Sequence, residues 1–140
     1  MSDRIFFELR LISYCRCSHF QYYYYNIMYI PKINEATDRD EIAAFMKQFS
    51  FATIITAKDS LPVGTHLPFI VTVRGENIVL TSHFAKANSQ WKDIESHPVL
   101  VIFSEPHAYI SPTHYDKELN VPTWNYISIH AYSRKLETPL

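Results

Sequence analysis

A succession of short β-branched runs, separated by turn residues, constrains the fold more than any other feature of the sequence. The clearest runs cover residues 50–57, 78–83 and 99–105. The third is so continuously apolar that we expect it to be buried on both faces. Residues 74–77, RGEN, predict a tight hairpin turn in front of the second run. Closely spaced strands with few helices predict a mainly β domain that closes into a small antiparallel barrel.

Further strands and two helices complete this pattern. Over residues 63–73 we expect one long strand bent near Pro68, or two short ones, and we expect additional strands over residues 107–112 and 126–133. Apolar residues at positions 42, 45, 46 and 49 form one stripe behind a capping Asp38, which predicts a helix over residues 38–48. A second, short helix is expected to have Asn88 as its cap and to end before Pro98.

Composition narrows the function classes. The 140 residues suit one domain, and 47% hydrophobic content suits a real core. The net charge of −1 gives no overall basic field for nucleic acid, and only two glycines occur, which excludes a P-loop and a Rossmann-type loop. No apolar run reaches the length of a transmembrane helix, so no membrane partner is expected. Cys15 and Cys17 are too close for an unstrained disulfide, which predicts a reducing, cytoplasmic location.

The first 27 residues differ from the rest of the chain. They contain both cysteines and four consecutive tyrosines, and they do not have the cleavage site of a signal peptide. We expect the natural protein to begin at Met28, with residues 1–27 an N-terminal extension outside the fold and residues 28–140 the domain. The alternative is that residues 1–27 supply a genuine extra strand or helix.

Polar residues at strand ends are the candidates for a binding site, and the richest cluster ends the run at residues 78–83. Ser82 and His83 close this strand, Lys86 follows, and Asn88 would open the short helix. A hydroxyl, a cation and the free N–H groups of a helix N-terminus can together hold one phosphate. The alternative is an ordinary strand–helix corner with an Asn cap and a solvated lysine.

Two further groups also leave alternatives open. His66 and the later histidines show no spacing typical of a metal site, so a structural histidine is the simpler interpretation and no metal is expected. Trp124 and Asn125 lie in a Pro-bounded loop, where an indole face suits stacking on a planar ring. Trp124 could instead plug one end of the barrel or pack on a partner subunit. No pair of carboxylates suited to acid–base catalysis stands out.

Seven motifs, taken in order, resemble one family. They are MYIP at residue 28, SFATIIT at 50, THLPF at 65, SHFAKANSQW at 82, VLVIF at 99, PHAYISPTHY at 106 and VPTWNY at 121. Over residues 28–132 the chain is similar to the FMN-binding negative transcriptional regulators, the PaiB-like proteins. The resemblance implies a flavoprotein with a six-stranded antiparallel, Greek-key-type split barrel. Such a barrel forms a homodimer and holds FMN in a groove at the dimer interface.

The resemblance also implies site residues, by motif position. It places the flavin ring or the partner subunit next to Trp124 and Asn125. It places the FMN phosphate near six residues at strand ends, namely Thr65, His66, Ser82, His83, Lys86 and Asn88.

One departure from the family pattern bears on function. Family members continue beyond the strand that follows WNY, so we expect this chain to be a truncated version with an incomplete barrel. The main hypothesis is an FMN-binding transcriptional regulator, and the alternatives are a flavin-dependent oxidoreductase of the split-barrel type and an inactive truncated paralogue. DNA is a conceivable partner, but no helix-turn-helix pattern or basic stripe supports direct contact.

Overall fold

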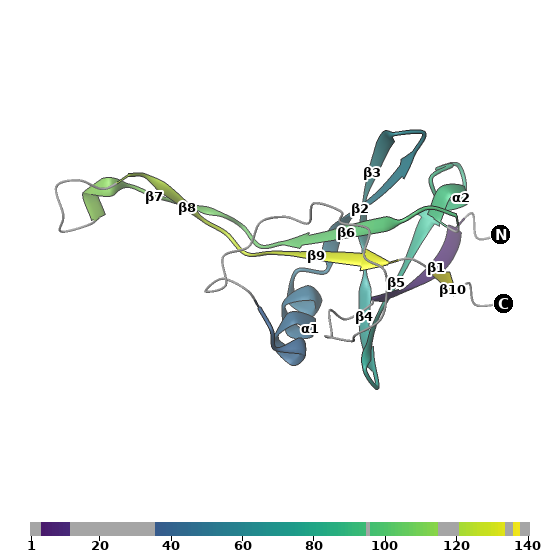
Figure 1. The fold of residues 1–140 in the computed structure, drawn as a ribbon, viewed down its shortest axis with the longest axis horizontal. Coiled ribbons are helices and arrows are strands. Elements are labelled where there is room, and N and C mark those ends of the chain that lie inside the picture. The colour runs from purple at the N-terminus through teal and green to yellow at the C-terminus, as the bar shows by residue number, and fades with distance from the viewer. Residues whose placement is uncertain (1–3, 12–35, 95, 115–120, 134–135, 138–140) are drawn as a thin grey trace, which may run out of the picture.

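Two four-stranded antiparallel sheets and a separate two-stranded ribbon make up the protein (Figure 1). The computed structural model describes residues 4–11, 36–94, 96–114, 121–133 and 136–137. The first sheet is ordered β10-β1-β5-β4, the second β3-β2-β6-β9, and the ribbon is β7-β8. The strands are β1 Arg4–Leu11, β2 Phe51–Lys58, β3 Leu61–Pro68, β4 Ile70–Arg74, β5 Asn77–Ala85, β6 Val99–Ser104, β7 Ala108–Ile110, β8 Thr123–Asn125, β9 Ser128–Ser133 and β10 Leu136–Glu137. The helices are α1 Arg39–Gln48 and α2 Trp91–Ile94, with a 3-10 turn at Pro112–His114.

The second sheet buries one face against the core. Along β2, Ala52, Ile54 and Thr56 are buried while the residues between them are not, which is the period of two expected for a strand with one covered face. The predicted strand at residues 99–105 is confirmed as β6, which lies between β2 and β9. Its odd-numbered residues are buried, but Leu100 and Ile102 are only half-buried. The expected burial on both faces is therefore correct for the inner face alone.

The first sheet supplies the other half of the core. In β5, Leu80 and Phe84 are fully buried, and the ring of Phe69 packs edge-on against Phe103 of the second sheet with centroids 5.7 Å apart. The chain crosses from one sheet to the other at Phe69, between β3 and β4, where the Phe69 N–H donates to the Ser50 carbonyl at 2.8 Å. Of the two interpretations of residues 63–73, the structure therefore shows two short strands.

Helix α1 begins where its cap predicts. One Asp38 carboxylate oxygen accepts from the N–H groups of Asp40 at 2.8 Å and Glu41 at 3.1 Å, which satisfies donors that a helix start leaves free. The buried side chains of the helix are Ala43 and Met46. The predicted helix over residues 38–48 is confirmed, because the local pattern of cap and apolar stripe agrees with the tertiary packing.

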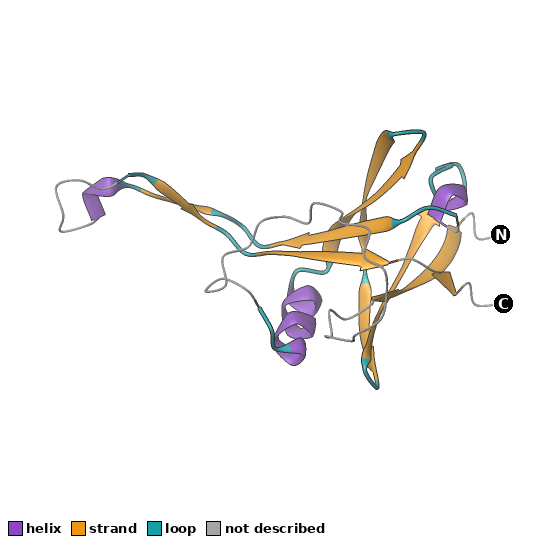
Figure 2. Ribbon diagram, viewed as in Figure 1, coloured by secondary structure: helices purple, strands orange, loops and turns teal. Residues whose placement is uncertain are grey.

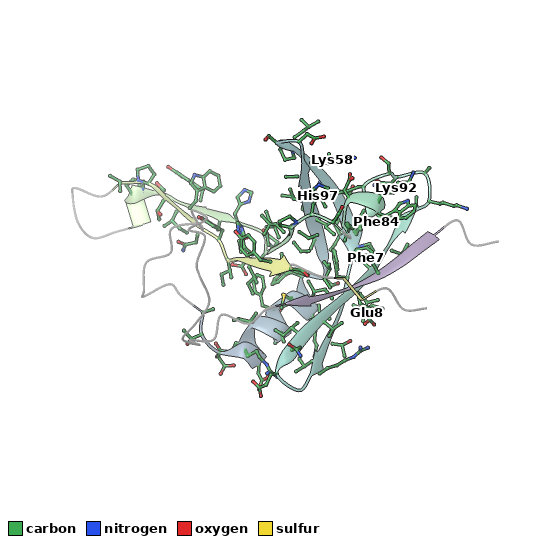
Figure 3. All side chains as sticks on the ribbon, turned by 45° about the vertical axis from the view of Figure 1, so that its right-hand side comes forward. Phe7, Glu8, Lys58, Phe84, Lys92 and His97 are labelled. Atoms are coloured by element: carbon green, nitrogen blue, oxygen red, sulfur yellow. The ribbon has the colours of Figure 1, made fainter. Side chains whose placement is uncertain are left out.

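Strand β1 differs from the prediction that residues 1–27 lie outside the fold. It pairs along its whole length with β5, and Phe7 and Leu9 are buried in the core. Figure 3 shows Phe7 next to Phe84, and their rings stack with centroids 5.1 Å apart. Residues 4–11 thus form the extra strand that was the alternative interpretation, because alternate apolar residues fill an open side of the core. Residues 12–27 lie outside the described residues.

The mainly β, split-barrel-like class predicted for the chain is confirmed, whereas the closed small barrel that the strand pattern alone suggested is not what the described part of the chain shows. Within the described residues the strands form two facing sheets and no closed barrel of six strands. Strands dominate the molecule, and the ribbon β7-β8 extends away from the two sheets (Figure 2). The ribbon therefore places its side chains far from the core.

Candidate functional site

At the corner between β5 and α2, residues 85–91, two polar side chains of the corner and one of β3 form a closed ring of hydrogen bonds. The Gln90 backbone N–H donates to Asn88 Oδ1 at 3.0 Å, Asn88 Nδ2 donates to Thr65 Oγ1 at 3.0 Å, and Thr65 Oγ1 donates to Gln90 Oε1 at 2.5 Å. Thr65 belongs to β3, so the ring joins this corner to the second sheet. Of the predicted phosphate residues, the structure thus brings Thr65 and Asn88 into direct contact.

Gln90 was not predicted as a site residue. Its side chain is 2% exposed, and Nε2 donates to the carbonyl oxygen of Val63 at 2.9 Å and more weakly to that of Ile54 at 3.3 Å. A third contact joins Nε2 to Thr56 Oγ1 at 3.3 Å. These partners lie 27 to 36 residues away in the sequence, so only the pairing of β2 with β3 reveals them.

The second helix is shorter than predicted. It starts at Trp91 and has four residues, whereas the sequence placed its start at Asn88. The Asn88 side chain caps a turn instead, since it accepts from the N–H of Gln90 two residues later. Gln90 N–H is therefore already bonded, and one helix turn carries little dipole. The predicted cradle of free helical N–H groups is not what the corner offers.

Lys86 is the exposed cation of this corner. The turn around it is closed by the Asn88 N–H, which donates to the Ala85 carbonyl at 2.9 Å, and Trp91 Nε1 approaches the Lys86 carbonyl at 3.4 Å. Among the described residues no carboxylate forms an ion pair with its ammonium group, whereas Lys58, at the end of β2 in the second sheet, pairs with Asp93 at 3.4 Å. Lys86 thus combines a held backbone with an unpaired side-chain charge.

Ser82 and His83 lie beside this corner but point to opposite faces of β5. The Ser82 side chain is buried, and its Oγ donates to the Pro68 carbonyl at 2.7 Å, which ties β5 to the end of β3. His83 is half-buried on the other face and has an interaction partner. The geometry gives Ser82 a structural role, since its one hydroxyl proton is already used.

His66 lies on the outer face of the second sheet. Its Nδ1 shares a hydrogen bond with Thr53 Oγ1 at 2.8 Å, and its ring lies over that of Phe51 at 6.3 Å. The strand register sets His66, Thr53, Ile102 and His130 in one row across the four strands. We call this side of the sheet the outer face, with Phe51, Thr53, Ile55, Gly64, His66, Leu100, Ile102, His130 and Tyr132. Burial lowers the pKa of His130 below its ordinary value.

Trp124 and Asn125 lie in β8, on the ribbon. The Trp124 side chain is 56% exposed, and its ring meets those of His107 and Tyr109 edge-on, with centroids 5.0 and 5.4 Å apart. Figure 1 shows β8 and α2 at opposite ends of the long axis of the molecule. One chain therefore keeps Trp124 apart from Lys86, although the sequence motifs placed both at the flavin.

An open depression of about 440 Å³ lies at the base of the ribbon, at the end of β2 remote from α2. Its lining residues are Gln48, Phe49, Ser50, Phe51, Ser104, Glu105 and Pro106. None of the predicted site residues lines it. Within the described ranges, no three His, Cys, Asp or Glu side chains gather as metal ligands would, and no helix is long and apolar enough to cross a membrane.

Comparison with known proteins identifies the family. The family model described as "Putative FMN-binding domain" matches residues 28–136. The chain is also 44% identical over 108 residues to "Protease synthase and sporulation protein PAI 2" of Bacillus subtilis (strain 168). That alignment covers 76% of this chain and 52% of the relative, so the chain spans about half the length of the curated relative it matches. The chain therefore belongs to the family of FMN-binding domains that its motifs indicated, the PaiB-like proteins.

Proposed function

We propose that this chain is the flavin-binding part of a cytoplasmic regulatory protein and that Lys86 holds the FMN phosphate. One observation carries the proposal: in a member of an FMN-binding family, an exposed ammonium group without a carboxylate partner among the described residues stands on a backbone turn held by hydrogen bonds. Charge-assisted bonds to phosphate are about twice as strong as neutral ones, so such a cation suits a dianionic ligand.

The other predicted phosphate residues would act in different ways. The side chains of Thr65 and Asn88 form hydrogen bonds with each other and with Gln90. They therefore support the turn that carries Lys86. Ser89 is exposed on the same turn, so its hydroxyl could add a further bond to the phosphate. His66 faces the outer side of the sheet, where it suits the flavin ring better than the phosphate.

The flavin ring needs an apolar surface, and the outer face provides one. Phe51 is 68% exposed there, and Ile55, Leu100 and Ile102 are half-buried. When bound, FMN supplies hydride and electron transfer at its ring, while the protein residues bind and orient it.

We propose a homodimer because one chain separates the two groups of candidate residues. The ribbon carries Trp124 away from Lys86 (Figure 1), and a second copy that packs on the outer face would bring its own ribbon toward the flavin of the first. The exposed aromatic residues of the ribbon, Tyr109, Trp124 and Tyr126, suit such a contact. Trp124 would then contact the ring bound by the partner subunit.

The regulatory part of the proposal comes from the relative, whose name refers to protease synthesis and sporulation. Regulation through the bound flavin, with no direct DNA contact, agrees best with the net charge of −1.

A paired titration tests the phosphate site. FMN and riboflavin, which has the ring but no phosphate, are titrated into the full chain and into Lys86→Ala. We expect FMN binding to weaken by roughly 1.5–3 kcal/mol, the range for a bond to a charged group, which is about ten-fold to a hundred-fold in Kd. Riboflavin binding should change little.

Lys47→Ala serves as the matched control, because Lys47 is also exposed but lies on α1. It changes the net charge by the same amount and should leave both affinities unchanged. Equal losses of FMN and riboflavin in Lys86→Ala would contradict the assignment of the phosphate to Lys86. A wild-type chain that binds FMN no better than riboflavin would contradict phosphate recognition altogether.

A further inference from the structure

We infer that Gln90 is a positioning residue, whose buried side chain fixes the turn that presents Lys86 to the phosphate. This inference rests on the proposed function and deepens it. Gln90 touches no ligand in this scheme, since all its side-chain polar atoms already have protein partners. Its role follows from its hydrogen bonds, because the one side-chain amide connects the turn to both β2 and β3.

The orientation of the Gln90 amide is determined by its surroundings. Its Nε2 faces the carbonyl oxygens of Val63 and Ile54, which can only accept, so the NH₂ group must lie on that side. Its Oε1 is then left to accept from Thr65 Oγ1. Because the Thr65 proton is directed at Gln90, the Thr65 oxygen is free to accept from Asn88 Nδ2.

The three hydrogen bonds of the ring therefore all run in one direction. Each member is donor to the next, from the Gln90 N–H through Asn88 and Thr65 back to Gln90 Oε1. Consecutive hydrogen bonds of such a chain polarise one another, and in a half-buried site each bond is stronger than it would be in water. Gln90 contributes its backbone N–H and its Oε1 to the ring, while its Nε2 donates outside the ring to the carbonyl oxygens of Val63 and Ile54. An amide at position 90 therefore accepts in the ring and donates to β2 and β3 at the same time.

The ring acts on Lys86 through the backbone. Asn88, held by its side chain, donates its own N–H to the Ala85 carbonyl and so closes the turn in which Lys86 stands. Trp91, which follows Gln90, approaches the Lys86 carbonyl from the other side. A loose turn would have to be ordered when the phosphate binds, and that ordering costs binding free energy. A turn already fixed by Gln90 avoids this cost.

The test uses the full chain with Gln90→Met, Thr65→Val and a matched control, Thr56→Val. Methionine keeps the length of glutamine but can neither close the ring nor donate to β2 and β3. Thr56 is buried and contacts the far end of the same amide at 3.3 Å, so its substitution perturbs the core and leaves the ring intact. Thr65 is only half-buried, and Thr65→Val opens the ring with a milder effect on folding should Gln90→Met not fold.

Two measurements separate this inference from the proposed function. Hydrogen exchange reports the turn without any ligand: the N–H groups of Asn88 and Gln90 should exchange about ten-fold faster in Gln90→Met and Thr65→Val than in Thr56→Val, which corresponds to about 1.4 kcal/mol. Titration with FMN and riboflavin reports function: the preference for FMN should fall about ten-fold in the first two variants and stay at the wild-type value in Thr56→Val.

Each outcome decides between the two ideas. Unchanged exchange in both ring variants overturns the positioning role of Gln90, whatever the flavin affinities. Faster exchange with an unchanged preference for FMN means that the turn does not control the phosphate, which overturns the inference and leaves Lys86 in place. A wild-type chain without preference for FMN overturns the proposed phosphate site, and the functional part of this inference with it.

Discussion

Replacing Phe7 by alanine tests the most unexpected feature of the fold, the contribution of residues 4–11 to the core. Phe7 is 2% exposed, stacks on Phe84 with centroids 5.1 Å apart and meets Phe69 edge-on at 6.2 Å. Truncating a buried phenylalanine typically costs about 3–5 kcal/mol, from lost transfer free energy and the cavity left behind. Domains are stable by only about 5–15 kcal/mol, so Phe7→Ala should lose a large share of the total.

Urea unfolding followed by tryptophan fluorescence measures this loss, because Trp91 packs against the core. With a slope of about 2 kcal/mol per molar urea, the midpoint should fall by roughly 1.5–2.5 M. Phe51→Ala is the matched control: Phe51 is also a strand phenylalanine but is 68% exposed. Its substitution should change stability by about 0.5 kcal/mol or less.

The two results also decide between the sequence prediction and the structure. If residues 1–27 were an extension outside the fold, Phe7→Ala would unfold at the same urea concentration as wild type. A midpoint equal to that of Phe51→Ala would refute the packing argument and restore the prediction that the domain begins at Met28.

Two further predictions concern the second sheet. Val101→Asp should abolish soluble expression, because Val101 has no exposed surface and a buried unpaired charge costs several kcal/mol, on the order of the whole stability; a soluble, folded variant would move β6 to the surface. Burial lowers the pKa of His130 from 6.5, so the unfolded chain takes up this proton first as the pH falls. The contribution of His130 to stability is complete above about pH 6.5 and is lost below it. Compared by urea unfolding at about pH 7.5 and about pH 5.5, His130→Gln should lose less stability than wild type, and an identical loss would contradict the assignment.

The sequence by itself determined those features that depend on neighbouring residues. The capping Asp38 and the apolar stripe behind it place α1, and the RGEN turn places the hairpin of β4 and β5, where Gly75 adopts a positive φ of 55°. The apolar run at residues 99–105 places β6 at the centre of a sheet. The order of the motifs was sufficient to identify the family, because motif order is read along the chain and does not depend on tertiary contacts.

Only the tertiary structure decided how the candidate site residues are used. Thr65 and Asn88 are 23 residues apart and meet because β3 and β5 come together. Ser82 lies on the inward side of β5 and bonds the Pro68 carbonyl, so a residue expected at the phosphate is structural. Trp124 lies at the opposite end of the molecule from Lys86. The order of the motifs along the sequence does not predict this distance in space.

Gln90 gives the physical reason for this division. A helix cap or a turn draws its hydrogen bonds from residues two to four positions away, so its pattern can be read along the chain. Gln90 draws its bonds from β2 and β3, at separations of 25 to 36 residues. Those partners are set by the register in which Ile54 pairs with Thr65. The register depends on which faces the two sheets bury against each other, and that is a property of the packed core.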